Sequence, residues 1–257
     1  MGVLVGVPGD DAGVAPGGGA PGPLRLADAG EAADLAAFLG RLLHYDRAAV
    51  VRLQSGAGAL AVFGRPPSFE VIAVRTVRLR APRPADGAVP APDGLDVTVS
   101  AGDLLEGVAE ERAEVAVPAP VTGPPWAGVL PPRGGWRPVP GLPGVTQMAR
   151  AVAGAVAEFR RRDEELPADR RTRGERDRIG HEIWSRTLGD TGLPLRAVHA
   201  ARSVGFLRPP GTAEGAGEAA LFAAGAWLRL RTAYGSVAVR VGGSGLAALP
   251  GLTVTRA

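Results

Sequence analysis

The stretch AVVRLQSGAGALAVF, residues 49–63, decides how the first part of the chain is interpreted. Two apolar runs, 49–53 and 59–63, flank the small residues 55–58 (SGAG), and this arrangement is typical of a β-hairpin. The same glycines match a G-x-G-x-x-A nucleotide-binding fingerprint, which requires a helix to begin directly after them. Residues 64–67 (GRPP) leave no room for that helix. The sequence therefore predicts a hairpin rather than a phosphate-binding loop.

A helix is predicted before this hairpin and a strand after it. Asp28 and Glu31 have the spacing of a capping box, and apolar residues at helical spacing follow them. Residues 70–80 predict a strand, but their alternation slips between Val74 and Val77. Such a slip indicates a β-bulge or an edge position in the sheet.

The middle of the chain predicts helices, and its end predicts a second hairpin. Residues 145–159 repeat apolar side chains at i, i+3, i+4 and i+7, and two shorter helices are expected at 176–188 and 194–206. Alternating apolar residues around Tyr234 and Gly235 then predict the hairpin. Shorter predicted elements are strands at 1–7, 96–99 and 252–255 and a helix that begins after Ser100.

These elements predict an α+β protein with a largely antiparallel sheet, hairpins near both ends, about three central helices and long Gly/Pro-rich loops. We expect a single domain over residues 1–257, with possible halves 24–117 and 144–257 joined by the Pro-rich loop 118–143. The segments 28–80 and 194–255 both have the order helix, hairpin, strand. A repeated unit is therefore one interpretation, although the residues themselves show no clear similarity.

The composition limits the classes of function. All 29 basic residues are Arg, so the lysine of a Walker-type phosphate loop is absent. The chain contains no Cys, which excludes disulfides and thiolate metal sites. The formal net charge of +3 gives little support for a polyanionic partner, so we regard nucleic acid as an unlikely partner.

No segment is apolar over the roughly 18–20 residues that a membrane helix requires. The apolar run 2–7 is too short for a signal peptide. We therefore expect a soluble, intracellular protein of the cytoplasm that does not associate with membranes.

The three histidines, His44, His181 and His199, are scattered and have no metal-ligand spacing, so no metal site and no cofactor are predicted. A Ser–His site could be assembled from Ser185 or Ser203 with His181 or His199, because such sites are defined by geometry and not by chain order. One alternative function is therefore a small-molecule-binding protein or a hydrolase-like enzyme with a pocket near His181 and His199. No catalytic residue is assigned.

A second alternative is a DNA-binding regulator that uses helix 194–206. The pair of helices 176–188 and 194–206 has the length of a helix-turn-helix, and Arg196, His199 and Arg202 would share one side of the second helix. DNA binding needs a basic surface, and the neighbouring charges are mixed. The pair is also what an ordinary helical bundle contains.

The loop 118–143 carries the residues that we select as a binding surface. It contains nine Pro and five Gly, and also two tryptophans. The aromatic rings either fix the loop onto the protein body or contact a partner, since Trp and Arg are the usual anchors of interfaces. The predicted binding residues are Trp126, Arg133, Trp136 and Arg137.

The motif LPPRGGW at residues 130–136 and Glu182-Ile183-Trp184 resemble stretches in uncharacterised proteins of high-GC actinobacteria. This resemblance implies no activity and assigns no functional residue. The sequence as a whole favours a non-enzymatic protein-interaction or regulatory function with a protein partner, and it does not predict an oligomeric state.

Overall fold

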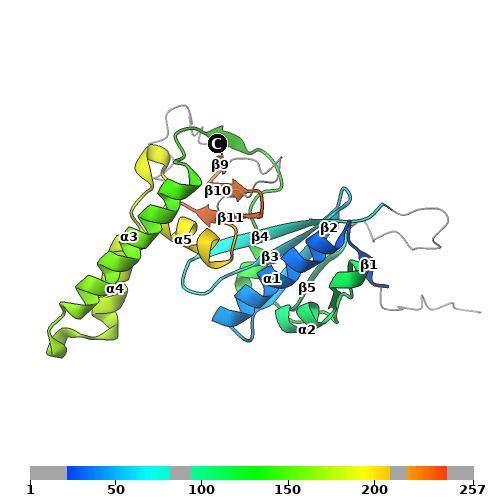
Figure 1. The fold of residues 1–257 in the computed structure, drawn as a ribbon, viewed down its shortest axis with the longest axis horizontal. Coiled ribbons are helices and arrows are strands. Elements are labelled where there is room, and N and C mark those ends of the chain that lie inside the picture. Colours follow the sequence, from blue (N-terminus) through cyan, green and yellow to red (C-terminus); the bar gives the residue numbers. More distant parts are fainter. Residues whose placement is uncertain (1–21, 82–93, 209–218, 242–257) are drawn as a thin grey trace, which may run out of the picture.

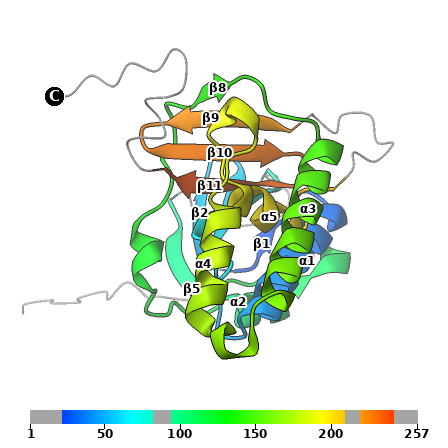
Figure 2. The same ribbon diagram turned by 90° about the vertical axis from the view of Figure 1, so that its left-hand side faces the viewer.

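The structure, a computed structural model, describes residues 22–81, 94–208 and 219–241. The strands predicted at 1–7 and 252–255 lie outside these ranges. Within them, the protein consists of one large antiparallel sheet, a group of helices, and a small second sheet (Figures 1 and 2). The predicted α+β class is confirmed.

The large sheet has eight antiparallel strands in the order β5-β2-β3-β4-β11-β10-β9-β8. The first four strands come from the first half of the chain and the last four from the second half. Their bounds are β2 Val50–Gly56, β3 Ala59–Gly64, β4 Val71–Arg78, β5 Asp96–Ser100, β8 Arg137–Val139, β9 Ala220–Ala224, β10 Trp227–Thr232 and β11 Gly235–Arg240. A small sheet of order β1-β7-β6 joins Leu24–Arg25, Glu114–Val115 and Val108–Ala109.

Five α-helices accompany the sheet: α1 Ala29–Tyr45, α2 Ala101–Glu106, α3 Val145–Glu164, α4 Arg173–Trp184 and α5 Leu195–Ser203. The Asp28 side chain caps α1 by accepting a hydrogen bond from the Glu31 backbone N–H at 2.9 Å, as the capping-box pattern predicts. Single turns of 3₁₀ helix lie at η2 Glu110–Arg112, η3 Pro125–Gly128, η4 Ala168–Arg170 and η5 Gly189–Thr191.

The glycine-rich stretch forms the predicted hairpin turn. Strands β2 and β3 pair from Val51 and Gly64 down to Gly56 and Ala59, and the turn residues Ala57 and Gly58 have φ angles of 50° and 71°. No helix follows the turn, because β3 continues directly into the sheet. The nucleotide-binding interpretation therefore does not hold.

Both halves contain a helix followed by a three-stranded meander: α1-β2-β3-β4 and α5-β9-β10-β11. The last strands of the two meanders, β4 and β11, pair and join the halves into one sheet. Helices α1 and α5 lie on the same face, where Phe38 stacks on Phe206 with ring centroids 5.3 Å apart. The second meander includes β9, which the sequence analysis missed.

The prediction of an edge strand or bulge at 70–80 is wrong. Strand β4 lies in the middle of the sheet and pairs with both neighbours in unbroken register. The alternation slips because Arg75 occupies a position on the buried face. Its guanidinium contacts Glu31 at 2.9 Å and Asp34 at 3.1 Å, both on α1, so a buried charge takes the place of an apolar side chain.

The other face of the sheet carries the segment that connects the halves. Residues 118–136 cross this face: the Val121 N–H donates to the Thr98 carbonyl at 2.8 Å, and Arg52 donates to the Ala127 carbonyl at 2.5 Å. The chain then enters the edge strand β8. We call residues 118–136 the strap and the sheet face beneath them the back face.

Helices α3 and α4 form an antiparallel hairpin that extends away from the sheet (Figures 1 and 2). Two bidentate ion pairs join them near the sheet-proximal end of α4: Arg162 with Glu182 at 2.8 Å and Arg186 with Glu158 at 2.6 Å. These guanidinium groups, Arg162 foremost, lower the pKa of Glu182 to about 2. Helix α3 also contacts α5, which sits between the hairpin and the sheet.

Candidate functional site

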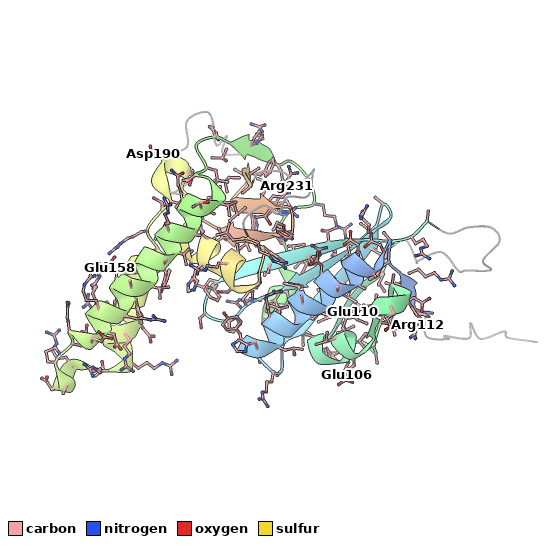
Figure 3. The ribbon with its side chains drawn as sticks, viewed as in Figure 1. Glu106, Glu110, Arg112, Glu158, Asp190 and Arg231 are labelled. Carbon is pink, nitrogen blue, oxygen red and sulfur yellow. The ribbon has the colours of Figure 1, made fainter. Side chains whose placement is uncertain are left out.

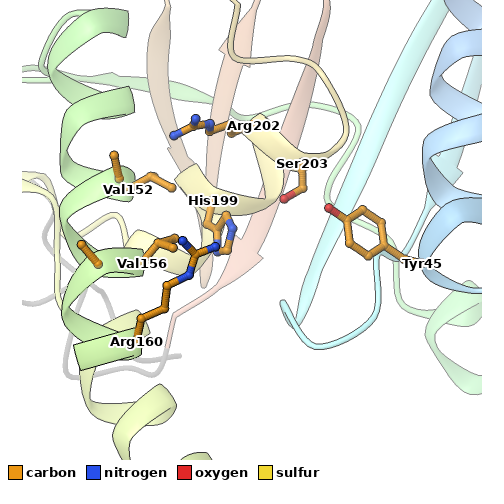
Figure 4. A pocket seen from close by; sticks show the side chains of 9 residues that line it. Tyr45, Val152, Val156, Arg160, His199, Arg202 and Ser203 are labelled. Carbon is orange, nitrogen blue, oxygen red and sulfur yellow. The ribbon is translucent and has the colours of Figure 1, made fainter. Parts of the chain in front are cut away.

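Among the residues that the structure describes, a cleft lies where the helical hairpin meets the sheet body. It has a volume of about 520 Å³, which is in the range of small-molecule sites. Helix α3 forms one wall, α5 forms the floor, and the end of α1 forms the opposite side (Figure 4). The cleft is lined by Tyr45, Val152, Ala153, Val156, Ala157, Arg160, His199, Arg202 and Ser203.

Helical periodicity explains how the two longer walls are built. On α3, Val152 and Val156 are one turn apart and turn an apolar surface to the cleft, with Arg160 a further turn along. On α5, the buried alanines and Val198 face the sheet, which leaves His199, Arg202 and Ser203 on the cleft side. Figure 4 shows the Arg160 side chain extending from α3 toward His199.

His199 is held among aromatic rings. Its imidazole stacks on Trp184 of α4, with centroids 4.5 Å apart, and meets the edge of Phe69 at 5.0 Å. Phe69 in turn contacts Tyr45 at 6.3 Å. Burial, with the nearby positive charge of Arg202 as the second cause, lowers the pKa of His199 below its ordinary value of 6.5. The imidazole is therefore neutral at pH 7.

The cleft is positively charged and carries hydroxyl groups at its mouth. Arg160 and Arg202 line it, and none of the nine lining residues is acidic. Within the described residues neither guanidinium forms an ion pair; Arg202 has only a long contact of 3.5 Å to the Ala149 carbonyl. The hydroxyls of Tyr45 and Ser203 point toward one another across the opening (Figure 4). Guanidinium and hydroxyl donors around an apolar wall suit an anion with an apolar part.

Of the Ser–His combinations weighed in the sequence, His199 with Ser203 is the one whose two members line this cleft. His199 and Ser203 lie one turn apart on α5 and both line the cleft, whereas His181 is exposed on α4 and does not line it. A carboxylate that could orient the imidazole is missing from the lining residues. The arrangement thus offers a neutral imidazole and a hydroxyl, without the third member of a catalytic triad.

The predicted binding residues Trp126, Arg133, Trp136 and Arg137 lie on the strap and on β8, away from the cleft. Both indoles are half-buried. The Trp136 N–H donates to the Pro132 carbonyl at 2.9 Å, and the Arg229 guanidinium lies over the ring at 5.7 Å. Trp126 borders a small hollow of about 140 Å³ at the junction of β4 and β11.

The two arginines of this group, Arg133 and Arg137, are exposed. The rings therefore contact the protein body, while the arginines point to solvent. Whether these four residues bind a partner stays a prediction.

The helix pair that resembled a helix-turn-helix does not present a free second helix. Helix α5 is shorter than predicted, and five of its nine residues are buried against the sheet. Its remaining face lies in the cleft beneath α3. A recognition helix must enter a groove with one side exposed along its length, so this burial removes the geometric support for DNA binding through residues 194–206.

Sequence reasoning missed Tyr45, Arg160 and Phe69, which come from three different parts of the chain. The only signal that pointed to this region was the scarcity of histidine, which singled out His199. Among the residues that the structure describes, no group of three His, Cys, Asp or Glu side chains could hold a metal ion. In the same residues, no helix is long and apolar enough to cross a membrane.

The fold and the cleft define an α+β protein in which two helix-and-meander units share one sheet and the second unit carries a cationic cleft. Comparison with protein families gives two matches. A family model described as a domain of unknown function, DUF8010, matches residues 20–128, and a second, DUF8185, matches residues 131–244. The boundary between the two matches falls within the strap. No curated protein matches the chain.

Proposed function

We propose that the protein binds a small anionic ligand in the cleft between α3 and α5, without catalysing its conversion. One observation carries this proposal: two guanidinium groups and no carboxylate line a cleft of about 520 Å³. Positive charge gathered in a recess attracts anions and repels cations. The apolar wall of α3 favours a ligand with a hydrocarbon or aromatic portion.

Binding is favoured over hydrolysis because His199 has no carboxylate partner in the cleft. A neutral imidazole without an orienting group is a poor general base, but it is a good hydrogen-bond partner for a ligand. Ser203 and Tyr45 supply further donors at the mouth. This ligand-binding role develops the first of the two alternatives that the sequence left open.

The test is isothermal titration with a panel of small mono- and dicarboxylates and phosphate monoesters. The matched variants are Arg160→Gln/Arg202→Gln, which removes both cleft charges, and Arg161→Gln, which removes the exposed neighbouring charge on α3. A charge-assisted hydrogen bond contributes about 1.5–3 kcal/mol, so the double variant should bind a hit at least tenfold more weakly. Arg161→Gln should bind like the wild type.

Two results would refute this function. One is that no panel member binds the wild type more tightly than about 1 mM. The other is that the double variant retains full affinity, because the ligand would then occupy another site.

A protein-interaction or regulatory function at Trp126, Arg133, Trp136 and Arg137 remains the second candidate. It is supported by the exposure of Arg133 on the strap and of Arg137 in the edge strand β8. The sharper test replaces these arginines by Ala and leaves the indoles in place, because the indoles contact the body. Loss of a crosslinked partner from the variant would support it, and an unchanged partner set would remove it. A cytoplasmic location and an actinobacterial origin stay predictions alongside it.

We further propose that the two halves fold as a single domain. The continuous sheet, the Phe38–Phe206 stack and the hydrogen bond from Arg75 to the Tyr234 carbonyl at 2.8 Å support this proposal.

A further inference from the structure

The back face of the second half carries a set of arginines stacked on aromatic rings. The Arg231 guanidinium lies 4.9 Å from the centroid of Phe222, and Arg240 lies 5.9 Å from that of Trp227. Arg229 lies over Trp136 of the strap at 5.7 Å. These side chains come from the adjacent strands β9, β10 and β11 and from the strap, so they form one continuous surface. We call it the arginine–aromatic face.

Among the described residues, the arginines of this face have no carboxylate as an ion-pair partner. Arg229, Arg231 and Arg240 form no ion pair within the ranges 22–81, 94–208 and 219–241, and the same holds for Arg65 beside the hollow at Arg240. The carboxylate of Glu70 borders the same hollow as Arg65 and Arg240, but its ion pair, at 3.8 Å, is with Arg196 of α5. In Figure 3, Arg231 lies on β10, the labelled carboxylates Glu106 and Glu110 lie at α2 and η2 in the first half, and Glu158 and Asp190 lie at α3 and η5.

The Arg229 guanidinium lies where burial makes its positive charge unfavourable. Its side chain is half-buried and donates to the Ser236 hydroxyl at 2.9 Å. Burial, followed by repulsion from Arg231, lowers the pKa of the Arg229 guanidinium. Burying a cation without a counter-charge is unfavourable, so the face gains free energy when an anion covers it.

The spacing of the charges follows from the sheet. Arg229 and Arg231 are two residues apart on one strand and therefore project from the same face about 7 Å apart. Arg240 adds a charge from the neighbouring strand. Regularly spaced charges of one sign suit a polymer with a repeating negative charge.

The stacked geometry distinguishes between two kinds of polyanion, nucleic acid and acidic protein segments. Protein partners usually insert or receive aromatic anchors, but the rings of this face are already covered by guanidinium groups. A guanidinium that covers a ring with one side leaves its other side open, and nucleotide bases stack on such planes. Single strands expose their bases for this contact, and duplexes do not.

We infer that the arginine–aromatic face binds single-stranded nucleic acid, with the phosphodiester backbone on Arg229, Arg231 and Arg240 and bases stacked on the guanidinium planes. This site is independent of the cleft, which lies on the opposite side of the sheet. The expectation that nucleic acid is an unlikely partner rested on helix 194–206 and on the net charge. It did not consider the face of the predicted hairpin around Tyr234 and Gly235, where these arginines lie.

The test is fluorescence anisotropy with labelled 20-nucleotide RNA and DNA of mixed sequence, titrated with the full chain at several salt concentrations. The test variant is Arg231→Gln/Arg240→Gln, because both side chains are exposed and their loss spares the fold. The matched control is Arg161→Gln/Arg173→Gln on the helical hairpin, which changes the net charge by the same amount. Circular dichroism verifies that all three proteins are equally folded.

The wild type should bind single strands at least tenfold more tightly than the matching duplex. The test variant should bind at least tenfold more weakly than the wild type. For the test variant, the slope of log K against log salt should become less steep by about 1.4, because each lost phosphate contact contributes about 0.7. The control variant should differ from the wild type by less than twofold, and Arg160→Gln/Arg202→Gln, which empties the cleft of charge, should bind single strands normally.

Three results would overturn the inference: no binding by the wild type at 50 mM salt, equal losses in the test and control variants, or displacement of the oligonucleotide by an equally charged poly-glutamate peptide at the same concentration. The last result would assign the face to an acidic protein segment instead.

Discussion

The two halves of the sheet are built from the same helix-and-meander unit, but the arginines on the sheet form ion pairs in one half and not in the other. In the first half, the back-face residue Arg52 pairs with Asp96 at 2.7 Å, and Gln54 donates to the same carboxylate at 3.1 Å. The Arg52 guanidinium, foremost through its hydrogen bond, lowers the pKa of Asp96. In the second half, the corresponding face carries arginines over aromatic rings and no carboxylate partner.

The side of the sheet that the helices cover shows the same difference in the pairing of arginines. Arg75 in the first half is neutralised by Glu31 and Asp34, whereas Arg160 and Arg202 in the second half line an open cleft. Charges that are paired within the chain stabilise the fold, and charges that are left unpaired remain available to a ligand. The comparison therefore places the buried ion pair of the sheet in the first half and the proposed binding surfaces in the second, whose bidentate ion pairs lie on the α3–α4 hairpin instead.

The largest expected effect comes from breaking the buried ion pair of the first half. Arg75→Ala leaves the Glu31 carboxylate, which is 11% exposed, with only the exposed Arg78 as a partner. Removing one partner of a buried pair costs about 3–5 kcal/mol. Urea unfolding should show a loss of this size.

The matched control for Arg75→Ala is Arg78→Gln, because the Arg78 side chain pairs with the same Glu31 but is 70% exposed. An exposed pair contributes about 0–1 kcal/mol. If both variants lost equal stability, the distinction between a stabilising first half and a binding second half would not stand.

A second prediction tests whether the halves are one unit. Leu53 is fully buried in β2, and Leu53→Ala should cost about 2–5 kcal/mol. All four tryptophans lie at residue 126 or beyond, outside the first meander. If the sheet unfolds as one domain, the midpoint reported by tryptophan fluorescence should shift together with that reported by circular dichroism.

The halves unfold separately if Leu53→Ala leaves the fluorescence midpoint unchanged while circular dichroism shows an additional transition at lower denaturant. The reverse variant, Leu230→Ala in β10, provides the control, because it destabilises the half that carries Trp184 and Trp227. It should lower the fluorescence midpoint under either outcome.

Some of this comparison could be predicted from the sequence. The first hairpin combines two short apolar runs with a small-residue turn, and both signals are local, so 49–63 was predicted correctly. The three central helices were predicted for the same reason, since their apolar spacing is visible within each segment.

The features that could not be predicted from the sequence depend on contacts between distant segments. The order helix, hairpin, strand in both halves was noticed, but β9 (ALFAA) has no polar residue to show alternation, and its pairing with β8 and β10 is set by the sheet. The position of β4 was misjudged because Arg75 is buried only through α1. The cleft residues Tyr45 and Arg160 are more than 100 positions apart, and no local pattern connects them.

A third prediction uses the hairpin turns at corresponding places in the two halves, of which the first has positive φ at both turn residues and the second at Gly225 alone. The first turn position is Ala57 in the β2–β3 hairpin and Gly225 in the β9–β10 hairpin, with φ angles of 50° and 51°. A side chain in this left-handed conformation costs about 1 kcal/mol, and Asn tolerates it better than Ala. Ala57→Asn should therefore raise the free energy of unfolding by about 0.5–1 kcal/mol, and Gly225→Ala should lower it by about 1 kcal/mol.

Both turns are open, and no atom lies within 4 Å of a Cβ placed on Gly225, so the effect measured is that of the backbone alone. Chemical denaturation of the two variants checks the prediction. A stabilising Gly225→Ala would mean that the two turns are not equivalent in solution.

The smallest effect concerns the histidines at the C-terminal parts of the two equivalent helices. His44 on α1 is exposed, whereas His199 on α5 is partly buried between Trp184 and Phe69. Because burial and then Arg202 lower the pKa of His199 below 6.5 in the folded protein, the unfolded chain binds a proton more readily. The contribution of His199 to stability is therefore full above about pH 6.5 and declines as the pH falls toward the folded pKa.

Thermal unfolding between pH 7.5 and 5 should show this decline in the wild type and a flatter profile in His199→Gln. Glu182, whose pKa is about 2, stays ionised over the whole range, so the ion pairs of the helical hairpin do not produce the slope. The matched variant His44→Gln should keep the wild-type profile, because its ring is exposed. If His44→Gln flattened the profile instead, the proton would be taken up at the first half, and the neutral state of His199 in the cleft would lose its support.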